Sequence, residues 1–301
     1  MIRPTGHHRY DTISFLSDYG TVDEFVGVVH AVVREIAPHV TVIDLTHQVP
    51  AFDVRAGSLT LARCISYVPS GVVLAVVDPG VGTDRKAIAV EVADGEGVIV
   101  GPDNGLIAPA VAMAGGAGRA VLLTNEEYHL GGAGATFAGR DLFAPAAAHL
   151  CNGVDLFELG EPIEADLLMP AVIPIAREEA GVMLGEVLWV DRFGNCQLNV
   201  SPAEVEHWGE RIRVSVGDRH APTVRAAKVV ANFTEIGTGA VGLVVDSYGM
   251  LALALDRRSA AEELAIGEGD QVVLIPITDD DPDARVSVTP VSSPVTLRTS
   301  R

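Results

Sequence analysis

The chain has 301 residues, of which 48% are hydrophobic, so it is long and apolar enough to form two domains with sizeable cores. Its 40 acidic residues against 21 Lys and Arg give a formal net charge of −19, which repels phosphate backbones and argues against nucleic acid as a partner. We expect no membrane partner, because no apolar run reaches the roughly eighteen residues of a membrane span and the N-terminus MIRPTGHHRY lacks a signal-peptide core.

Strands and helices alternate between about residues 12 and 150. Short apolar runs predict strands at residues 13–17, 40–45, 72–77, 88–92, 98–100 and 121–123. Helical spacing of apolar residues predicts helices at about residues 25–36 and 54–67, after the turn at 101–105, and from Asp141 to Leu150. The fully apolar run 72–77 suggests a sheet that is covered on both faces. This alternation is typical of an α/β domain with a largely parallel sheet.

After Pro170 the pattern changes, and long helical periodicity is missing. Short strand-like runs between turns occur at residues 186–190, 211–216, 241–245, 251–255 and 271–275. They predict a smaller β-rich, barrel-like domain, with a sandwich as the alternative. The expected organisation is an N-terminal domain 1–171, a linker 172–181, a C-terminal domain 182–278, and a charged tail 279–301 that is partly disordered.

Three cysteines, Cys64, Cys151 and Cys196, lie far apart without a CxxC pair. They predict no disulfide framework or zinc site, and a reducing cytoplasm is the simplest location. No metal-ligand spacing such as HExxH and no GxSxG nucleophile motif occurs. His30 falls in a helical pattern and is expected to pack or face solvent, whereas His47 follows a strand and could be functional or a turn residue.

Polar residues follow three of the predicted strands, at residues 17–20, 78–82 and 101–105. In open α/β sheets, ligands collect at the carboxyl ends of the strands. The glycines there do not match a phosphate loop or a dinucleotide fingerprint, and an acid such as Asp78 suits a hydroxyl, an amine or a cation. The structural alternatives are a turn-forming or capping Asp78 and an Arg85 that is solvated or paired with Asp84.

Six segments occur in the order and spacing of one known family: FLSDYG, DLTHQVPAFDV, VVDPGVGT, GPDNGLI, TFAGRDLFAPAAA and VDRFGNCQLNV. Over about residues 12–275 the chain resembles the S-adenosyl-L-methionine (SAM) hydroxide adenosyltransferases, which are related to fluorinases and chlorinases. The resemblance implies a homotrimer in which SAM binds between the N-terminal domain of one subunit and the C-terminal domain of its neighbour. It also implies attack of a water-derived hydroxide on C5′ of the ribose, giving adenosine and L-methionine without a metal or other cofactor.

The resemblance further implies which side chains bind SAM. Asp18 would accept hydrogen bonds from both ribose hydroxyls. The other implied positions are Phe52 and Phe137 around the nucleoside, Asp191 and Asn195 at the methionine amino group, and Ser247 at the methionine carboxylate. Ordinary core packing is the alternative for the two phenylalanines.

Asp78 and Arg85 are the implied catalytic residues, which would position and polarise a water molecule beside C5′. A carboxylate at this position repels a halide, which favours a hydrolase over a halogenase. One departure is Ala138, because the family reads TFHGRD where this chain reads TFAGRD. His129 could enter the site instead, Asp78 and Arg85 could suffice, or turnover could be lost. The alternatives are therefore a SAM- or adenosine-binding protein without turnover and, third, a halogenase.

Overall fold

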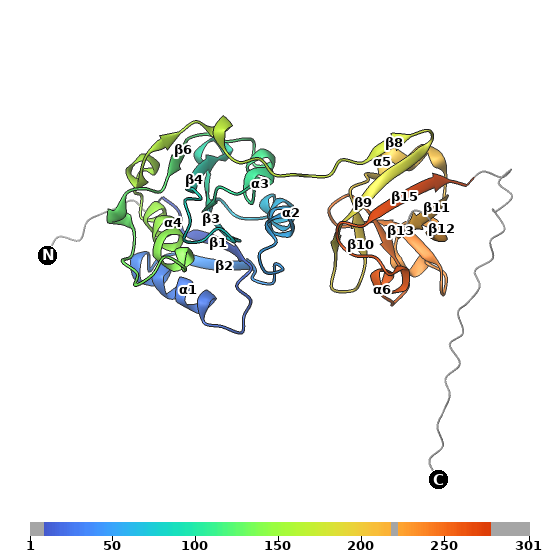
Figure 1. Ribbon diagram of the computed structural model, residues 1–301, viewed down its shortest axis with the longest axis horizontal. Helices are drawn as coiled ribbons and strands as arrows, with labels where there is room; N and C mark the ends of the chain where they lie inside the picture. The colour runs from blue at the N-terminus through green and yellow to red at the C-terminus, as the bar shows by residue number, and fades with distance from the viewer. Residues whose placement is uncertain (1–8, 218–221, 278–301) are drawn as a thin grey trace, which may run out of the picture. The chain divides into compact units, whose positions relative to one another are not determined.

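The computed structural model describes residues 9–217 and 222–277 and divides into two compact units, Met1–Val172 and Ile173–Arg301 (Figure 1). The expected tail 279–301 lies outside the described residues. Part of the segment expected as a linker is a strand, because β8 (Arg177–Glu179) pairs with β9 (Val182–Val190). In the described part of the chain, no helix is both long and apolar enough to cross a membrane.

The N-terminal unit is built on a seven-stranded sheet with the order β2-β1-β3-β5-β4-β6-β7. The first four strands in this order run parallel and the rest are antiparallel. The strands are β1 (Thr12–Ser17), β2 (Thr41–Thr46), β3 (Gly71–Val76), β4 (Ala87–Val92), β5 (Gly97–Pro102), β6 (Ala120–Leu122) and β7 (Pro162–Ile163). The prediction of an α/β domain with a largely parallel sheet is confirmed.

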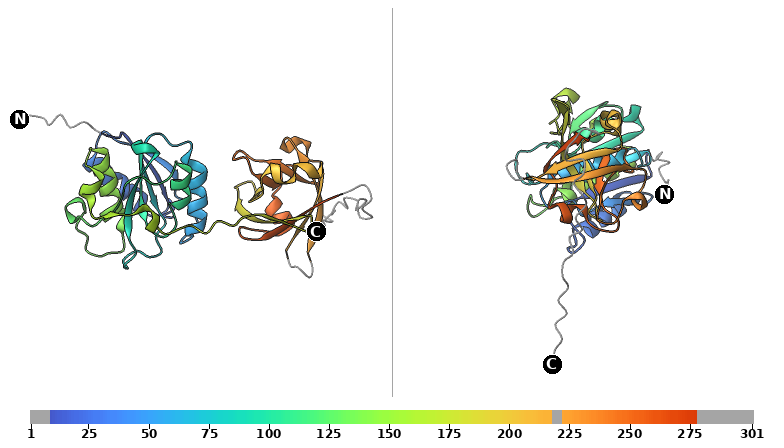
Figure 2. Two further views of the ribbon diagram at one scale, coloured as in Figure 1. Left: turned by 90° about the horizontal axis from the view of Figure 1, so that it is seen from above. Right: turned by 90° about the vertical axis from the view of Figure 1, so that its right-hand side faces the viewer.

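Helices cover both faces of this sheet, as the buried strand β3 requires (Figure 2). The helices are α1 (Phe25–Ile36), α2 (Val54–Ile65), α3 (Ala108–Met113) and α4 (Ala144–Cys151). One core packs α1 and α4 against residues such as Phe15 and Leu74, and a second packs α2 and α3 against residues such as Ala75 and Val77. The helix expected from Asp141 begins as a π-helical turn at Gly139–Phe143, which continues into α4.

The C-terminal unit is a closed β-barrel, so the barrel prediction is confirmed over the sandwich. Its eight-stranded sheet has the order β10-β14-β13-β12-β11-β15-β9-β8, and an additional pairing of β10 with β9 closes the ring and leaves β8 outside it. The remaining strands are β10 (Cys196–Leu198), β11 (Arg211–Val216), β12 (Thr223–Val230), β13 (Val241–Val245), β14 (Leu251–Ala254) and β15 (Gln271–Pro276). Two short helices, α5 (Pro202–Val205) and α6 (Ala260–Leu264), lie between strands.

The order of strands in the N-terminal sheet puts the topological switch point, where open α/β sheets have their ligand crevice, at the carboxyl ends of β1 and β3. The chain runs from β1 to β2 on one side and then returns to β3 on the other, so the loops after β1 and β3 diverge. Ser17 at the end of β1 is in register with Val76 at the end of β3. Asp18 and Asp78, which follow these residues by one and two positions, therefore start from neighbouring strand ends.

Candidate active site

Asp78 and Arg85 form a buried ion pair at the end of β3. The Arg85 Nε donates to both carboxylate oxygens, at 2.8 and 2.9 Å, and Nη2 donates to Oδ2. The two side chains are only 6% and 15% exposed, and the guanidinium lies 5.0 Å above the ring of Phe143. Arg85 is therefore neither a solvated charge nor the partner of Asp84, and both ions are held rigidly where water has little access.

The intervening turn brings these residues together across seven positions of sequence. The Thr83 hydroxyl donates to the Gly80 carbonyl at 2.6 Å, and the Val81 amide donates to the Asp78 carbonyl at 3.1 Å. Gly82 adopts φ +78°, a conformation that residues with a Cβ rarely adopt. The sequence PGVGT thus folds the chain back so that Arg85 reaches the acid that ends the strand.

Asp18 anchors an exposed aromatic residue beside the crevice. Its Oδ2 accepts a hydrogen bond from the Phe52 amide at 2.9 Å. Phe52 has φ +68° and its side chain is 73% exposed, so it is neither relaxed nor part of the core. A bulky residue in this conformation costs free energy, and such strain concentrates at binding sites. Core packing, the alternative for Phe52, is therefore excluded, because the ring is exposed.

Tyr19 connects the predicted residues and was not singled out in the sequence. Burial raises the pKa of the Tyr19 phenol above its ordinary value; the carboxylates of Asp18 and Asp78 raise it further, whereas Arg85 lowers it. The phenol therefore stays protonated at neutral pH. Its ring meets the Phe137 ring edge-on at 5.8 Å. The only signal in the sequence was its place next to Asp18.

Two further features concern the strand that ends before Asp78 and the residues packed around Tyr19. The Asn104 side chain donates to the Val77 carbonyl at 2.9 Å and accepts from the Leu106 amide at 3.1 Å, so the third polar loop braces the strand that presents Asp78. At the start of the π-helical turn, a Cβ on Gly139 would collide with the Tyr19 hydroxyl. π-Helical turns are frequent at functional sites, and here one allows α4 to approach Tyr19.

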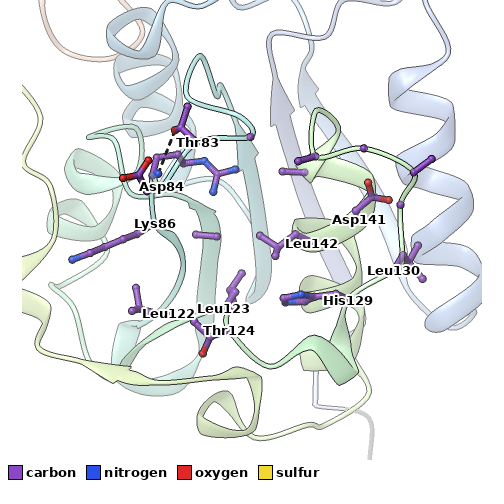
Figure 3. Close-up of a pocket in the computed structure, with 18 residues that line it drawn as sticks. Thr83, Asp84, Lys86, Leu122, Leu123, Thr124, His129, Leu130, Asp141 and Leu142 are labelled. Atoms are coloured by element: carbon purple, nitrogen blue, oxygen red, sulfur yellow. Dashed lines mark hydrogen bonds between the residues drawn. The ribbon is translucent and has the colours of Figure 1, made fainter.

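A cavity of about 680 Å³ opens next to Arg85 and is also lined by Ala138 and His129 (Figure 3). Figure 3 shows Thr83 and Lys86 on one side of it and His129 on the other. Burial lowers the pKa of His129, which favours a neutral imidazole. The structure therefore places His129 and Ala138 along one cavity with Arg85, although no hydrogen bond joins His129 to Arg85 among the described residues.

In the C-terminal unit, Asp191 and Asn195 form one turn between β9 and β10. Asp191 Oδ1 accepts from the amides of Phe193 and Asn195 at 2.8 and 2.9 Å, and Oδ2 accepts from the Asn195 side chain at 2.7 Å. Asn195 also lines a cavity of about 500 Å³ together with the exposed rings of Phe193 and Phe233. This turn offers oriented polar groups beside apolar surface, which suits a ligand that has both.

Ser247 lies on a different turn, between β13 and β14. It is exposed and does not line the cavity beside Asn195. Its neighbour Asp246 accepts hydrogen bonds from the amides of Tyr248 and Met250 at 2.9 and 3.0 Å, and from the Gln197 side chain on β10. The structure thus brings Asp191 and Asn195 together. The turn of Ser247 is linked to β10, the strand that follows Asn195, but Ser247 does not line the cavity beside Asn195.

The N-terminal unit has the features of an enzyme that acts on a small molecule. The Asp78–Arg85 pair follows β3, and Asp18, which accepts from the Phe52 amide, follows β1. These two strand ends form a topological switch point, the usual place for ligands in such sheets. Two family models match the chain: the SAM hydroxide adenosyltransferase N-terminal domain over residues 13–160 and the C-terminal domain over residues 185–273. The chain belongs to this family, which confirms the resemblance found in the sequence.

Similar proteins agree with this membership. A protein of Salinispora tropica named (R)-S-adenosyl-L-methionine hydrolase is 44% identical over 260 residues, covering 86% of this chain and 96% of the relative. One of the same name from Thermus thermophilus is 41% identical over 271 residues, covering 87% and 99%. A crystal structure of an uncharacterized conserved protein from Thermotoga maritima superposes with a TM-score of 0.79 at 33% identity, covering 87% and 99%. A fluorinase of Actinoplanes sp. is more distant, at 26% identity over 221 residues, 65% of this chain and 74% of the relative.

Proposed function

We propose that this protein hydrolyses SAM to adenosine and L-methionine by attack of a water molecule on C5′ of the ribose. The observation that carries the proposal is the buried Asp78–Arg85 pair beside Asp18, in a chain whose relatives at 41–44% identity are named SAM hydrolases. Asp78 Oδ2 accepts from both Nε and Nη2 of Arg85, whereas Oδ1 accepts from Nε alone and keeps one lone pair. This lone pair can accept a hydrogen bond from a water molecule and orient its oxygen toward C5′.

The proposed step is a single displacement. A bond forms between the water oxygen and C5′ while the bond from C5′ to the sulfonium sulfur breaks, and its electron pair stays on sulfur as the neutral thioether of methionine. The surplus proton passes from the attacking water through Asp78 to solvent. The sulfonium is a good leaving group, so no general acid is required, and the rate comes from alignment and desolvation.

The substrate-binding roles follow the same geometry. Asp18 would accept hydrogen bonds from the ribose diol, and Phe52 and Phe137 would pack against the nucleoside. In the C-terminal unit, Asp191 and Asn195 would hold the methionine ammonium, with Ser247 at the carboxylate. The remaining lone pairs of Asp191 are available because its present hydrogen bonds come from its own turn.

We further propose a homotrimer that binds SAM between the N-terminal unit of one subunit and the C-terminal unit of its neighbour, acting in the cytoplasm without cofactor or nucleic acid. Mixing subunits tests this arrangement. If the sites are shared, Asp78→Asn chains mixed with an equal amount of Asp191→Ala chains regain about a quarter of the wild-type sites, because random pairing in a symmetric ring joins two intact halves that often. The assay uses SAM far below KM, where sites with Asp191→Ala keep only about a tenth of the wild-type rate. A mixture no more active than its two components kept apart contradicts shared sites.

Two other functions have specific observations behind them. Ala138 leaves open space in the cavity next to Arg85, which favours a SAM- or adenosine-binding protein with little turnover. The fluorinase relatives make halogenation the third candidate function, but the Asp78 carboxylate at the end of β3 would repel a halide. Hydrolysis remains the better-supported function because the catalytic pair is fully formed.

The test is to incubate the purified protein with SAM and to separate nucleosides by chromatography. Both sulfonium epimers should be assayed, because the relatives are named for the (R) form. Adenosine and methionine in equal amounts are expected. Tight SAM binding by calorimetry without adenosine over hours would support the binding protein, and a 5′-halo-5′-deoxyadenosine formed in chloride or fluoride would support the halogenase.

A further inference from the structure

A cluster of two histidines and an aspartate lies behind the loop that carries Asp18. His30 on α1 and His47 after β2 direct their Nε2 atoms at the same oxygen, Asp44 Oδ1 on the edge strand β2, at 2.8 and 3.0 Å. The three ligand atoms all lie within 4.8 Å of one another. They come from two segments, α1 and the end of β2, since Asp44 and His47 are only three residues apart.

His47 is the buried member of the cluster. Its side chain is 4% exposed, and its Nδ1 lies 2.8 Å from the buried Ser17 hydroxyl. Its Nε2 is buried and lies 3.0 Å from Asp44 Oδ1 without the geometry of a hydrogen bond. A divalent ion bound by both of these atoms would satisfy both of them.

The surroundings hold the ligands in place but leave one side open. The buried Phe15 ring packs against His47 at 4.6 Å and against His30 at 6.3 Å between ring centroids. Asp44 and His30 are 43% and 36% exposed. Fixed imidazole planes with an open solvent side are what an ion with three protein ligands and one exchangeable ligand needs.

We propose that His30, Asp44 and His47 bind one divalent transition-metal ion of the zinc class, with a water molecule or a small ligand in the remaining position. Two imidazole nitrogens and one carboxylate oxygen suit Zn²⁺, Co²⁺ or Ni²⁺ rather than Mg²⁺ or Ca²⁺, which prefer all-oxygen ligands. His47 then binds through Nε2 and donates from Nδ1 to Ser17, as metal-bound histidines commonly do with a second partner.

The site would stabilise the crevice without taking part in the proposed displacement. The His47 carbonyl accepts a hydrogen bond from the Gly20 amide at 2.7 Å, so His47 is bonded to the loop of Asp18 through both its side chain and its backbone. A bound ion would tie this loop to α1 and β2. The alternative is a metal-free polar chain from Ser17 through His47 and Asp44 to His30, in which the Asp44 carboxylate is contacted by both imidazoles.

Calorimetric titration with ZnCl₂, without SAM, tests the proposal on the full chain. The background is His7→Gln/His8→Gln, which removes the adjacent N-terminal histidines as competing ligands. We expect one ion per chain, a higher unfolding temperature with Zn²⁺ than with EDTA, and the visible absorption of tetrahedral Co²⁺ when CoCl₂ replaces ZnCl₂. The assay does not depend on SAM hydrolysis, so the two proposals fail separately.

The variant His30→Gln/Asp44→Asn should lower the affinity by at least about 100-fold, since losing even an outer-shell partner costs about 10–100-fold. Both side chains are partly exposed, so the fold should survive, and unfolding in EDTA checks this; the single variant His30→Gln, with about a tenfold loss or more, is the second test. His207→Gln in the C-terminal unit is the matched control and should bind as the background does. Absence of binding in the background, or unchanged binding in His30→Gln, would overturn the proposal.

Discussion

The two units place an aspartate in contrasting environments. Asp78 in the α/β unit is 6% exposed, and an arginine seven residues away engages both its oxygens. Asp191 in the barrel accepts its hydrogen bonds from amides and a side chain within its own five-residue turn. The first arrangement depends on the fold of a whole strand–turn segment, whereas the second is local. The difference suggests that chemistry needs a charge fixed by its surroundings, while binding needs only an oriented turn.

The aromatic residues follow the same division. In the α/β unit, Tyr19 and Phe25 both pack edge-on against Phe137 and meet each other at a tilt. In the barrel, the rings of Phe193 and Phe233 are exposed beside the cavity of Asn195. Packed rings hold a polar site rigid, and exposed rings gain free energy when a ligand covers them. We therefore expect changes at the buried charged pair of the first unit to act on kcat, and changes at exposed residues of either unit, Phe52 included, to act on KM.

The largest effect should come from Asp78→Asn, which keeps the shape and removes the charge. The expected loss in kcat is about 10²-fold or more, the usual contribution of a positioned acid–base group, with little change in KM. Arg85→Lys should show a similar loss, because one ammonium cannot engage two oxygens side by side. Steady-state adenosine formation is the measurement, and Asp84→Asn, an exposed acid one residue before Arg85, is the control. If Asp84→Asn lost as much kcat as Asp78→Asn, the special role assigned to Asp78 would be wrong.

Asp191→Ala should act on binding. It removes the acceptor of three hydrogen bonds in the turn and one contact to the substrate, so KM should rise about tenfold, in line with about 1 kcal/mol per hydrogen bond. The value of kcat should stay within about twofold. Asp256→Asn, which changes an acid that lines the same cavity without breaking the turn, should leave both parameters near the wild type. A drop in kcat with unchanged KM in Asp191→Ala would reverse the assigned roles.

Phe52 allows strain and binding to be separated. Phe52→Gly removes the ring and also relieves φ +68°, whereas Phe52→Ala removes the ring alone. Both variants should raise KM a few fold, but the glycine variant should be more stable than the alanine variant by about 1 kcal/mol. Thermal unfolding of the two proteins measures the difference. If they unfold at the same temperature, the strain assigned to this turn is absent.

The smallest effect is expected at Ala138. Ala138→His places an imidazole in the cavity beside Arg85, where it could orient the attacking water. We expect a gain in kcat of less than about tenfold, because a general acid–base group contributes most when no other group already holds the proton. His129→Gln in both backgrounds reports whether the nearby imidazole has this role. No gain from Ala138→His means that the Asp78–Arg85 pair suffices.

Much of the α/β unit could be predicted from the sequence, because each feature is local. Apolar strands that end on polar residues placed Asp18 and Asp78 at the edge of a sheet, and the hairpin around Asp94 follows from its turn residues. The helix at residues 141–150 was located correctly, but its π-helical start was not. That start depends on the contact between Tyr19 and Gly139, which no local pattern reveals.

Features that depend on strand order could not be predicted. No metal-ligand spacing joins His30 to Asp44 and His47 in the sequence. The three residues meet because β2 pairs with β1 and α1 packs in one core with β1. The pairings of β9 with β15 and of β10 with β14, which complete the barrel, likewise join strands that are far apart in the sequence. In both cases the side chains are ordinary in sequence, and the fold supplies their neighbours.

The central claim is that water, held by Asp78 and Arg85, attacks C5′ of SAM. Turnover in H₂¹⁸O followed by mass spectrometry of both products tests it most directly. The account predicts adenosine that carries ¹⁸O at its 5′-hydroxyl, methionine without the label, and loss of this product in Asp78→Asn. Labelled methionine, unlabelled adenosine, or full label in Asp78→Asn at the wild-type rate would contradict it.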